Sequence, residues 1–137
     1  MRHIILLILF SLTFGCATSK HTEIDLSILN GVWKPIKQEI GGKELPLSLF
    51  KNQKLTLIDS SYTLVAESID KGVVKYNEGK MDIYGKEGVN SGKHFTAIYK
   101  IENEQLIICY NLLGDSYPTE FETKSKPTLF LSIFKKD

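Results

Sequence analysis

Two cysteines and three histidines carry the side chains in this chain that are best suited to nucleophilic or metal chemistry. A catalytic thiol needs a positioned base beside it, and a metal site needs clustered His, Cys or carboxylate ligands. His21 lies in a polar segment, His94 and Cys109 in strand-like segments, and none has ligand-like spacing; a Cys109–His94 pair across neighbouring strands is the one conceivable exception. The chain has no G-x-S-x-G motif and no phosphate-binding glycine loop. We therefore expect no enzymatic activity, no metal and no cofactor.

Cys16 is better placed for acylation than for a disulfide. It follows a basic start, an apolar run over residues 4–10 and Gly15, which together have the parts of a secretory signal. The run is too short to span a membrane, which takes about 20 residues. The cysteine directly after a small residue resembles the bacterial lipobox, in which the cysteine is acylated and becomes the new N-terminus. Thr13 stands where the lipobox most often has Leu, so an ordinary secretory signal that contains a cysteine remains the alternative.

The lipobox resemblance implies three segments. Residues 1–15 are the signal peptide, 16–25 the lipidated N-terminus with a polar tether, and 26–137 one domain. The modified cysteine of this class usually carries more than one acyl chain, which suits stable anchoring. We expect a protein of the bacterial cell envelope, lipid-anchored to a membrane, in which Cys109 is a lone buried thiol.

The charge of the chain argues against nucleic acid as a partner. Arg2 is the only arginine among 17 basic residues, so the chain after the signal has 16 lysines against 16 acidic residues. No basic run is interleaved with aromatic residues. The lack of arginine also removes the best bidentate ligand for phosphate. We expect a monomer that binds no nucleic acid and contacts a membrane through its N-terminal lipid anchor.

The elements that position these residues are short apolar runs separated by turn residues. The turns are "GGK", "DSS", "DKG", "NEG" and "ENE", with longer connections at 86–92 and 112–127. Strands joined by short links favour antiparallel neighbours, and eight can close into a barrel without exposed edges. The sequence thus predicts an all-β fold, a single antiparallel up-and-down β-barrel of about eight strands, at residues 30–40, 53–58, 62–69, 72–76, 80–85, 94–101, 105–111 and 128–134.

Several local features follow from the pattern. Alternation places Phe95 and Tyr99 on one face of their strand and His94 on the other. Pro35 removes a ladder donor from the first strand, which predicts a bulge or a strand edge there. Asp25 is placed to cap one helical turn. The last two strands are apolar on both faces, which indicates either a packed wall or a surface that meets a partner, and we expect the packed wall.

The start of the first strand resembles the G-x-W signature of lipocalins. Gly31 and Trp33 match it, and in lipocalins this tryptophan plugs the closed end of the barrel. A lipocalin arginine near the last strand packs over the tryptophan. This chain has no arginine there, so Lys135 or Lys136 would have to replace it through a cation–π contact.

A broader resemblance is to an uncharacterised bacterial domain family, known mainly from planctomycetes and often carried on exported proteins. It covers nearly all of residues 26–136, and Tyr117 replaces the family's usual arginine. The resemblance implies a lipocalin-like β-fold and brings no known activity. The matching residues are Gly31 and Trp33, Gly42 to Pro46, Ile98 and Tyr99, Leu106 to Cys109, and Pro118 to Phe121.

Two binding hypotheses remain. In the first, the barrel holds a small hydrophobic ligand, with Trp33, Phe95, Tyr99 and Tyr110 as candidate lining residues, since aromatic side chains with polar tips suit such pockets. In the second, the barrel is filled by these side chains and the domain is a protein-interaction or structural module of the envelope that uses its long connections. An apolar cavity of a few hundred Å³ favours the first hypothesis.

Overall fold

The computed structural model describes residues 25–137, which form one antiparallel sheet of nine strands. Two 3₁₀ turns accompany them, η1 (Leu26–Leu29) and η2 (Leu47–Leu49). Among these residues no helix has the length and apolarity to cross a membrane. The strands are β1 (Gly31–Ile40), β2 (Lys43–Glu44), β3 (Lys54–Ile58), β4 (Ser61–Val65), β5 (Ile69–Asn77), β6 (Lys80–Glu87), β7 (His94–Glu102), β8 (Gln105–Asn111) and β9 (Leu129–Lys136).

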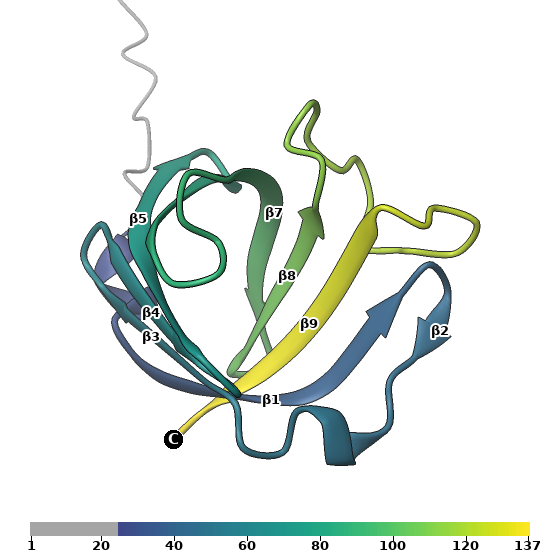
Figure 1. Cartoon of the computed structure of the whole chain (residues 1–137), viewed down its shortest axis with the longest axis horizontal. Helices are drawn as coiled ribbons and strands as arrows, with labels where there is room; N and C mark the ends of the chain where they lie inside the picture. The colour runs from purple at the N-terminus through teal and green to yellow at the C-terminus, as the bar shows by residue number, and fades with distance from the viewer. Residues whose placement is uncertain (1–24) are drawn as a thin grey trace, which may run out of the picture.

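The first strand closes the sheet. β1 pairs with β3 through Gly31–Trp33 and with β9 from Trp33 to Ile40, while β2 pairs only with the end of β1. Eight strands therefore form a closed up-and-down barrel, and β2 is a short addition at its edge (Figure 1). The predicted fold class is confirmed. The strand pairs and the core clusters described here are made by residues 25–137 with one another, so this part of the chain has a closed sheet and a core of its own.

The two ends of the barrel differ in their connections. Three tight turns, at 59–60, 78–79 and 103–104, join strands at one end, which we call the closed end. Asn103 and Glu104 both have positive φ, as do Glu78 and Gly79, which is the backbone of two-residue hairpin turns. The longer connections, 41–53, 66–68, 88–93 and 112–128, all lie at the opposite end, which we call the mouth.

Two local predictions are confirmed. The register of β1 against β9 shifts between Pro35 and Lys37, so the proline produces a bulge. Asp25 caps η1, and its Oδ1 accepts a hydrogen bond from the backbone N–H of Ser27 at 3.0 Å.

The predicted "DKG" turn is wrong, because these residues lie inside β5 and the chain turns at 66–68 instead. Asp70 is buried at 3% exposure and accepts a hydrogen bond from the backbone N–H of Asn90. Gly72 is needed for close packing and not for a turn. A Cβ there would lie 2.0 Å from the carbonyl oxygen of Tyr84 and 2.6 Å from the ring of Tyr62.

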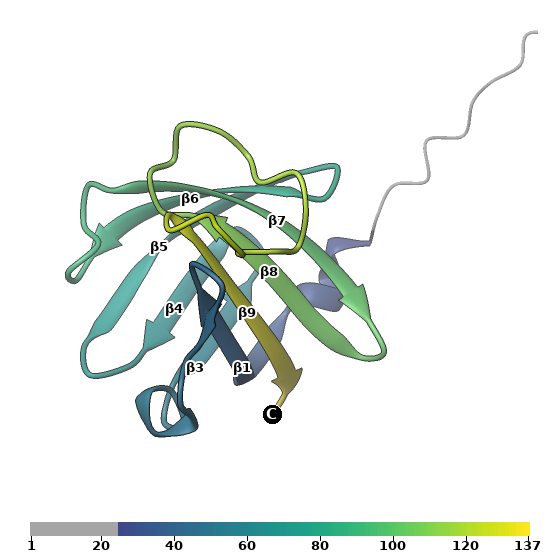
Figure 2. The same ribbon diagram turned by 90° about the vertical axis from the view of Figure 1, so that its right-hand side faces the viewer.

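The outer face of β8 and β9 is covered by the protein's own 112–128 segment, as Figure 2 shows. Cys109, Leu129 and Leu131 are buried beneath it, and Phe121 packs against them. Thr123 ties the segment to the first hairpin, because its hydroxyl accepts from the Gly42 N–H and donates to the Glu39 carboxylate. The expected packed wall is therefore present.

The Cys109 thiol is enclosed by this wall. Burial raises its pKa, and Cys109 lies opposite Ile98 in the ladder, four residues along β7 from His94. The conceivable Cys109–His94 pair is therefore not formed.

Candidate binding cavity

Trp33 plugs the closed end of the barrel. Its ring is 2% exposed, and its Nε1 donates a hydrogen bond to the carbonyl of Leu29 in η1 at 2.8 Å. Lys136 takes the position considered for a basic residue: its Nζ lies 5.2 Å from the centre of the Trp33 ring and donates to the carbonyl of Ile28 at 3.2 Å. A cation and a helical turn thus seal this end.

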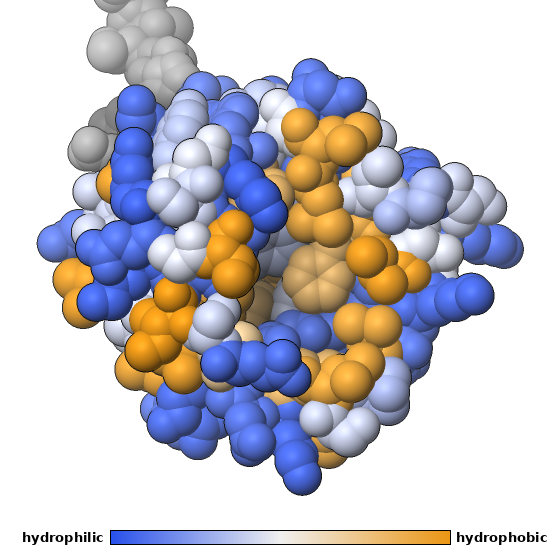
Figure 3. All heavy atoms as spheres, in the orientation of Figure 1, coloured by the Kyte–Doolittle hydropathy of each residue, from blue (hydrophilic) through white to orange (hydrophobic). Residues whose placement is uncertain are grey.

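A cavity of about 230 Å³ lies between this plug and the mouth. It is visible as a hollow among apolar side chains in the space-filling view (Figure 3). Its walls come from the inward-facing residues of strands β1 and β3 to β9, together with three residues of the mouth connections. They are Gln38, Gln53, Leu55, Leu57, Tyr62, Leu64, Val74, Met81, Ile83, Asn90, Phe95, Ile108, Tyr110, Leu112, Phe130 and Phe134.

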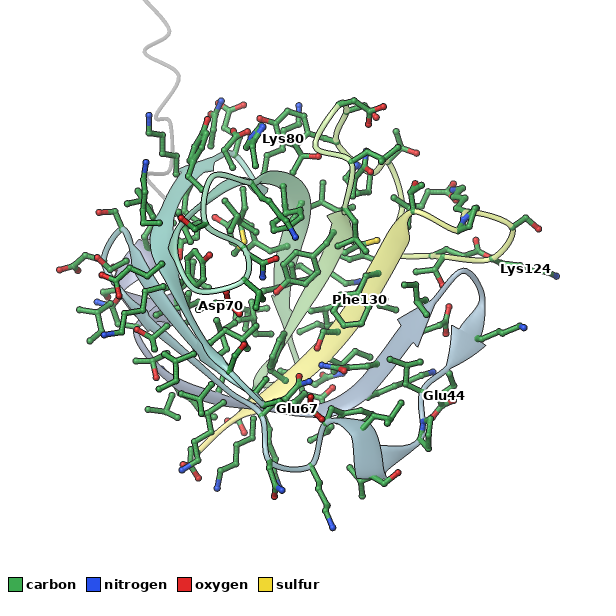
Figure 4. All side chains as sticks on the ribbon, viewed as in Figure 1. Glu44, Glu67, Asp70, Lys80, Lys124 and Phe130 are labelled. Atoms are coloured by element: carbon green, nitrogen blue, oxygen red, sulfur yellow. The ribbon has the colours of Figure 1, made fainter. Side chains whose placement is uncertain are left out.

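Three amide side chains supply polar groups to this wall. Gln38 is 4% exposed, and its amide nitrogen donates to Gln53 Oε1 at 2.8 Å and to Ser132 Oγ at 3.3 Å. Asn90 reaches the cavity from the connection between β6 and β7. That connection is held by the 3.0 Å hydrogen bond from the Asn90 backbone to Asp70 (labelled in Figure 4), so the residue is fixed at the mouth.

Tyrosine hydroxyls supply the remaining polar groups inside the barrel. Tyr110 stacks on Phe130 (also labelled in Figure 4) with ring centres 5.7 Å apart, and burial raises its pKa far above the usual value. Burial also raises the pKa of Tyr62, with a smaller contribution from Asp70. The Tyr76 hydroxyl is buried without a hydrogen-bond partner among the described residues, and burial raises its pKa to about 12. These hydroxyls therefore stay protonated and can donate a hydrogen bond to a ligand that reaches them.

The four candidate residues divide into two pairs. Phe95 and Tyr110 line the cavity. Trp33 and Tyr99 lie in the core and do not line it, and the Tyr99 ring instead meets Tyr76 edge-on at 5.6 Å. Alternation distinguishes inward from outward residues but not depth along the barrel axis, so the sequence could not separate the two pairs.

The sequence interpretation missed several wall residues. Phe130 and Phe134 could have been found, because they fall in phase with each other in β9, but the apolar residues between them hid the alternation. Asn90 had no detectable signal, since its position depends on a buried carboxylate in another strand.

The mouth is surrounded by exposed apolar side chains from all four of its connections or the strand ends beside them, and we call these residues the rim. They are Leu47, Leu49, Val65, Ile69, Val89, Leu112 and Leu113, between 37% and 66% exposed. Figure 3 shows apolar residues on several sides of the hollow. Leu112 belongs both to the rim and to the cavity wall, so the two apolar surfaces meet at this residue.

A second polar cluster lies on the outer face of β6 and β7. Asp82 accepts hydrogen bonds from the Tyr117 hydroxyl at 2.5 Å and pairs with His94 Nε2 at 2.8 Å, and the His94 ring stacks on Tyr84. The Tyr117 hydrogen bond is the main cause of the lowered pKa of Asp82. Tyr117, which stands where the resembled family has arginine, thus fastens the 112–128 segment to β6. The cluster has a structural task, and the described residues contain no group of three potential metal ligands.

Comparison with known proteins gives no relative: no family model matches the chain, and no curated protein matches it in sequence. The predicted signal peptide and the predicted lipidation site, Cys16, lie outside the described residues.

Proposed function

We propose that this domain binds a small, mainly apolar ligand inside the barrel and is not an enzyme. The observation that carries the proposal is the cavity of about 230 Å³ beneath the mouth. Binding sites for small molecules are typically concave and mostly apolar, with a few placed polar groups. The cavity has this composition, and the rim extends its apolar surface outward. A ligand longer than the cavity would rest its outer part on the rim.

The proposal predicts that the domain carries a ligand when it is purified. Residues 25–137, exported from a bacterial host and measured by native mass spectrometry without detergent, should show an adduct of lipid or metabolite size. The adduct should be lost after denaturation and refolding in clean buffer. A barrel that binds nothing under either condition, and nothing when ligands are added back, would favour the alternative of a structural or interaction module.

We further propose that the protein is a lipoprotein of the bacterial envelope, attached to a membrane by acylated Cys16. The support is the signal-like sequence before Gly15 and the polar residues that follow the cysteine. Cys16→Ser should move the full chain from the membrane fraction to the soluble fraction after export. Cys109→Ser is the matched control and should leave the chain on the membrane, because the Cys109 thiol is enclosed in the barrel wall. Membrane retention of Cys16→Ser would contradict acylation.

The lipocalin-like resemblance is part of the same proposal. Trp33 at the closed end and Lys136 over its ring support common ancestry with barrels that open with a G-x-W motif. The planctomycete-type domain family is proposed on the residues that match its sequence pattern, Gly31 and Trp33 among them. In this chain Tyr117, at the position of that family's arginine, donates a hydrogen bond to Asp82.

A further inference from the structure

The cavity wall contains no charged residue. Among its 16 residues there is no Asp, Glu, Lys, Arg or His, and its polar groups are amides and tyrosine hydroxyls. Two charged groups contact wall residues from outside: the Asp70 carboxylate accepts from the Asn90 backbone N–H and raises the pKa of Tyr62, and the Lys93 ammonium donates to Asn90 Oδ1 at 3.4 Å. Lys93 does not line the cavity, so an anion inside the barrel would meet no cation of the wall and would approach the Asp70 carboxylate.

We propose that the cavity selects uncharged ligands that combine a short apolar chain with one hydrogen-bonding group, and that it rejects carboxylates of the same chain. The inference rests on the proposed function and names the ligand class. Moving a carboxylate into a low-dielectric site without a partner has a large unfavourable desolvation free energy. The desolvation of a hydroxyl, carbonyl or ether is largely offset when the group forms a hydrogen bond inside the site.

Unused hydrogen-bonding groups lie near the mouth end of the cavity. β8 runs toward the mouth and ends at Asn111, so Tyr110 lies one residue from that end, and its hydroxyl makes no hydrogen bond to another described residue. The Gln53 side chain accepts from Gln38 and leaves its own amide N–H groups without a partner in this part of the chain. A ligand's polar group can therefore be met by neutral donors beside the opening.

The deeper wall is mostly apolar, and Tyr62, which lies opposite Leu57, adds one hydroxyl there. Leu57, Met81, Ile108 and Phe134 line it and lie toward the closed end along their strands. The ligand is therefore oriented with its chain toward Trp33 and its polar group at the mouth. An apolar cavity of about 150 Å³ holds benzene, so 230 Å³ suits a chain with on the order of ten non-hydrogen atoms.

Calorimetric titration of residues 25–137 with octan-1-ol, octanoate and octylammonium at pH 7.5 tests the inference. These probes share one chain and differ in the charge of the head. We expect octan-1-ol to bind at least tenfold more tightly than either ion. Tyr110→Phe keeps the ring and removes the hydroxyl, and should weaken octan-1-ol binding about two- to tenfold, the range of one hydrogen bond.

A second variant tests the reason for the selectivity. Gln53→Lys places a cation in the cavity wall at a half-buried mouth position and should raise the affinity for octanoate at least severalfold. Equal or tighter binding of octanoate or octylammonium than of octan-1-ol by the unmodified domain would overturn the inference and leave the proposed function standing. Binding of none of the three probes would overturn both.

Discussion

At the scale of single residues, one carboxylate links the stability of this barrel to pH through its hydrogen bonds. It belongs to Asp82, and it accepts from Tyr117 on the covering segment and pairs with His94 on the neighbouring strand. Its pKa is lowered, first by the Tyr117 hydroxyl. A lowered folded-state pKa means that the contribution to stability is complete above the unfolded-state value, about 3.9, and is lost as pH falls through the folded-state value.

Tyr117→Phe should therefore weaken the pH dependence of stability in acid. Urea unfolding between pH 5 and pH 2 should show a smaller loss of the free energy of unfolding for this variant than for the parent, because Asp82 protonation then disrupts less. The variant should be less stable than the parent at pH 5 and approach it at pH 2. Tyr76→Phe is the matched control, since its hydroxyl has no partner, and should keep the parent's pH profile. An unchanged profile for Tyr117→Phe would contradict the role given to this hydrogen bond.

Residue identity predicted contacts only where the partner was close in sequence or fixed by a known motif. Asp25 was placed correctly as a cap because its partner, Ser27, is two residues away. Lys136 was considered for the cation over Trp33 because the motif fixes where that cation must come from. Asp70 was misplaced in a turn, because its partner Asn90 belongs to a connection whose path no local pattern encodes.

At the scale of elements, alternation and turn residues predicted the strands well and the covering segment poorly. Short apolar runs bounded by turn residues predicted all eight barrel strands, and period-two alternation was visible in some of them, such as β4 and β7. The 112–128 segment has no periodic pattern, and its position depends on Phe121 and Thr123 reaching the outer face of other strands. Its position over these strands explains why β8 and β9 are apolar on both faces. The sequence alone indicated a packed wall but did not identify the segment that covers it.

At the scale of the whole molecule, the two ends of the barrel differ in structure: one end is sealed and the other carries the cavity. The tight turns, η1 and the Trp33–Lys136 plug seal the closed end, where the chain also enters the barrel at Asp25. The long connections, the rim and the cavity belong to the mouth.

Because the cavity lies within one cooperative barrel, filling it should be linked to the stability of the whole domain. A ligand at 100 times its dissociation constant stabilises the folded state by about 2.7 kcal/mol, which for a domain of this size raises Tm by roughly 10 °C. Octan-1-ol should produce such a rise in thermal unfolding followed by circular dichroism. Val74→Phe places a larger side chain in the cavity and should remove most of the ligand-induced rise, whether the ring itself stabilises the empty barrel or strains it.

Val73→Phe is the matched control for this experiment. Val73 precedes Val74 in β5 and points to the opposite face of the sheet, so the same enlargement there leaves the cavity unchanged. The control should keep the full rise in Tm with octan-1-ol. If Val74→Phe kept the full rise as well, the ligand would bind outside the cavity, and the rim alone would have to account for it. Loss of the rise in Val74→Phe together with its retention in Val73→Phe would place the ligand inside the barrel, because the two substitutions differ only in the face of β5 that they enlarge.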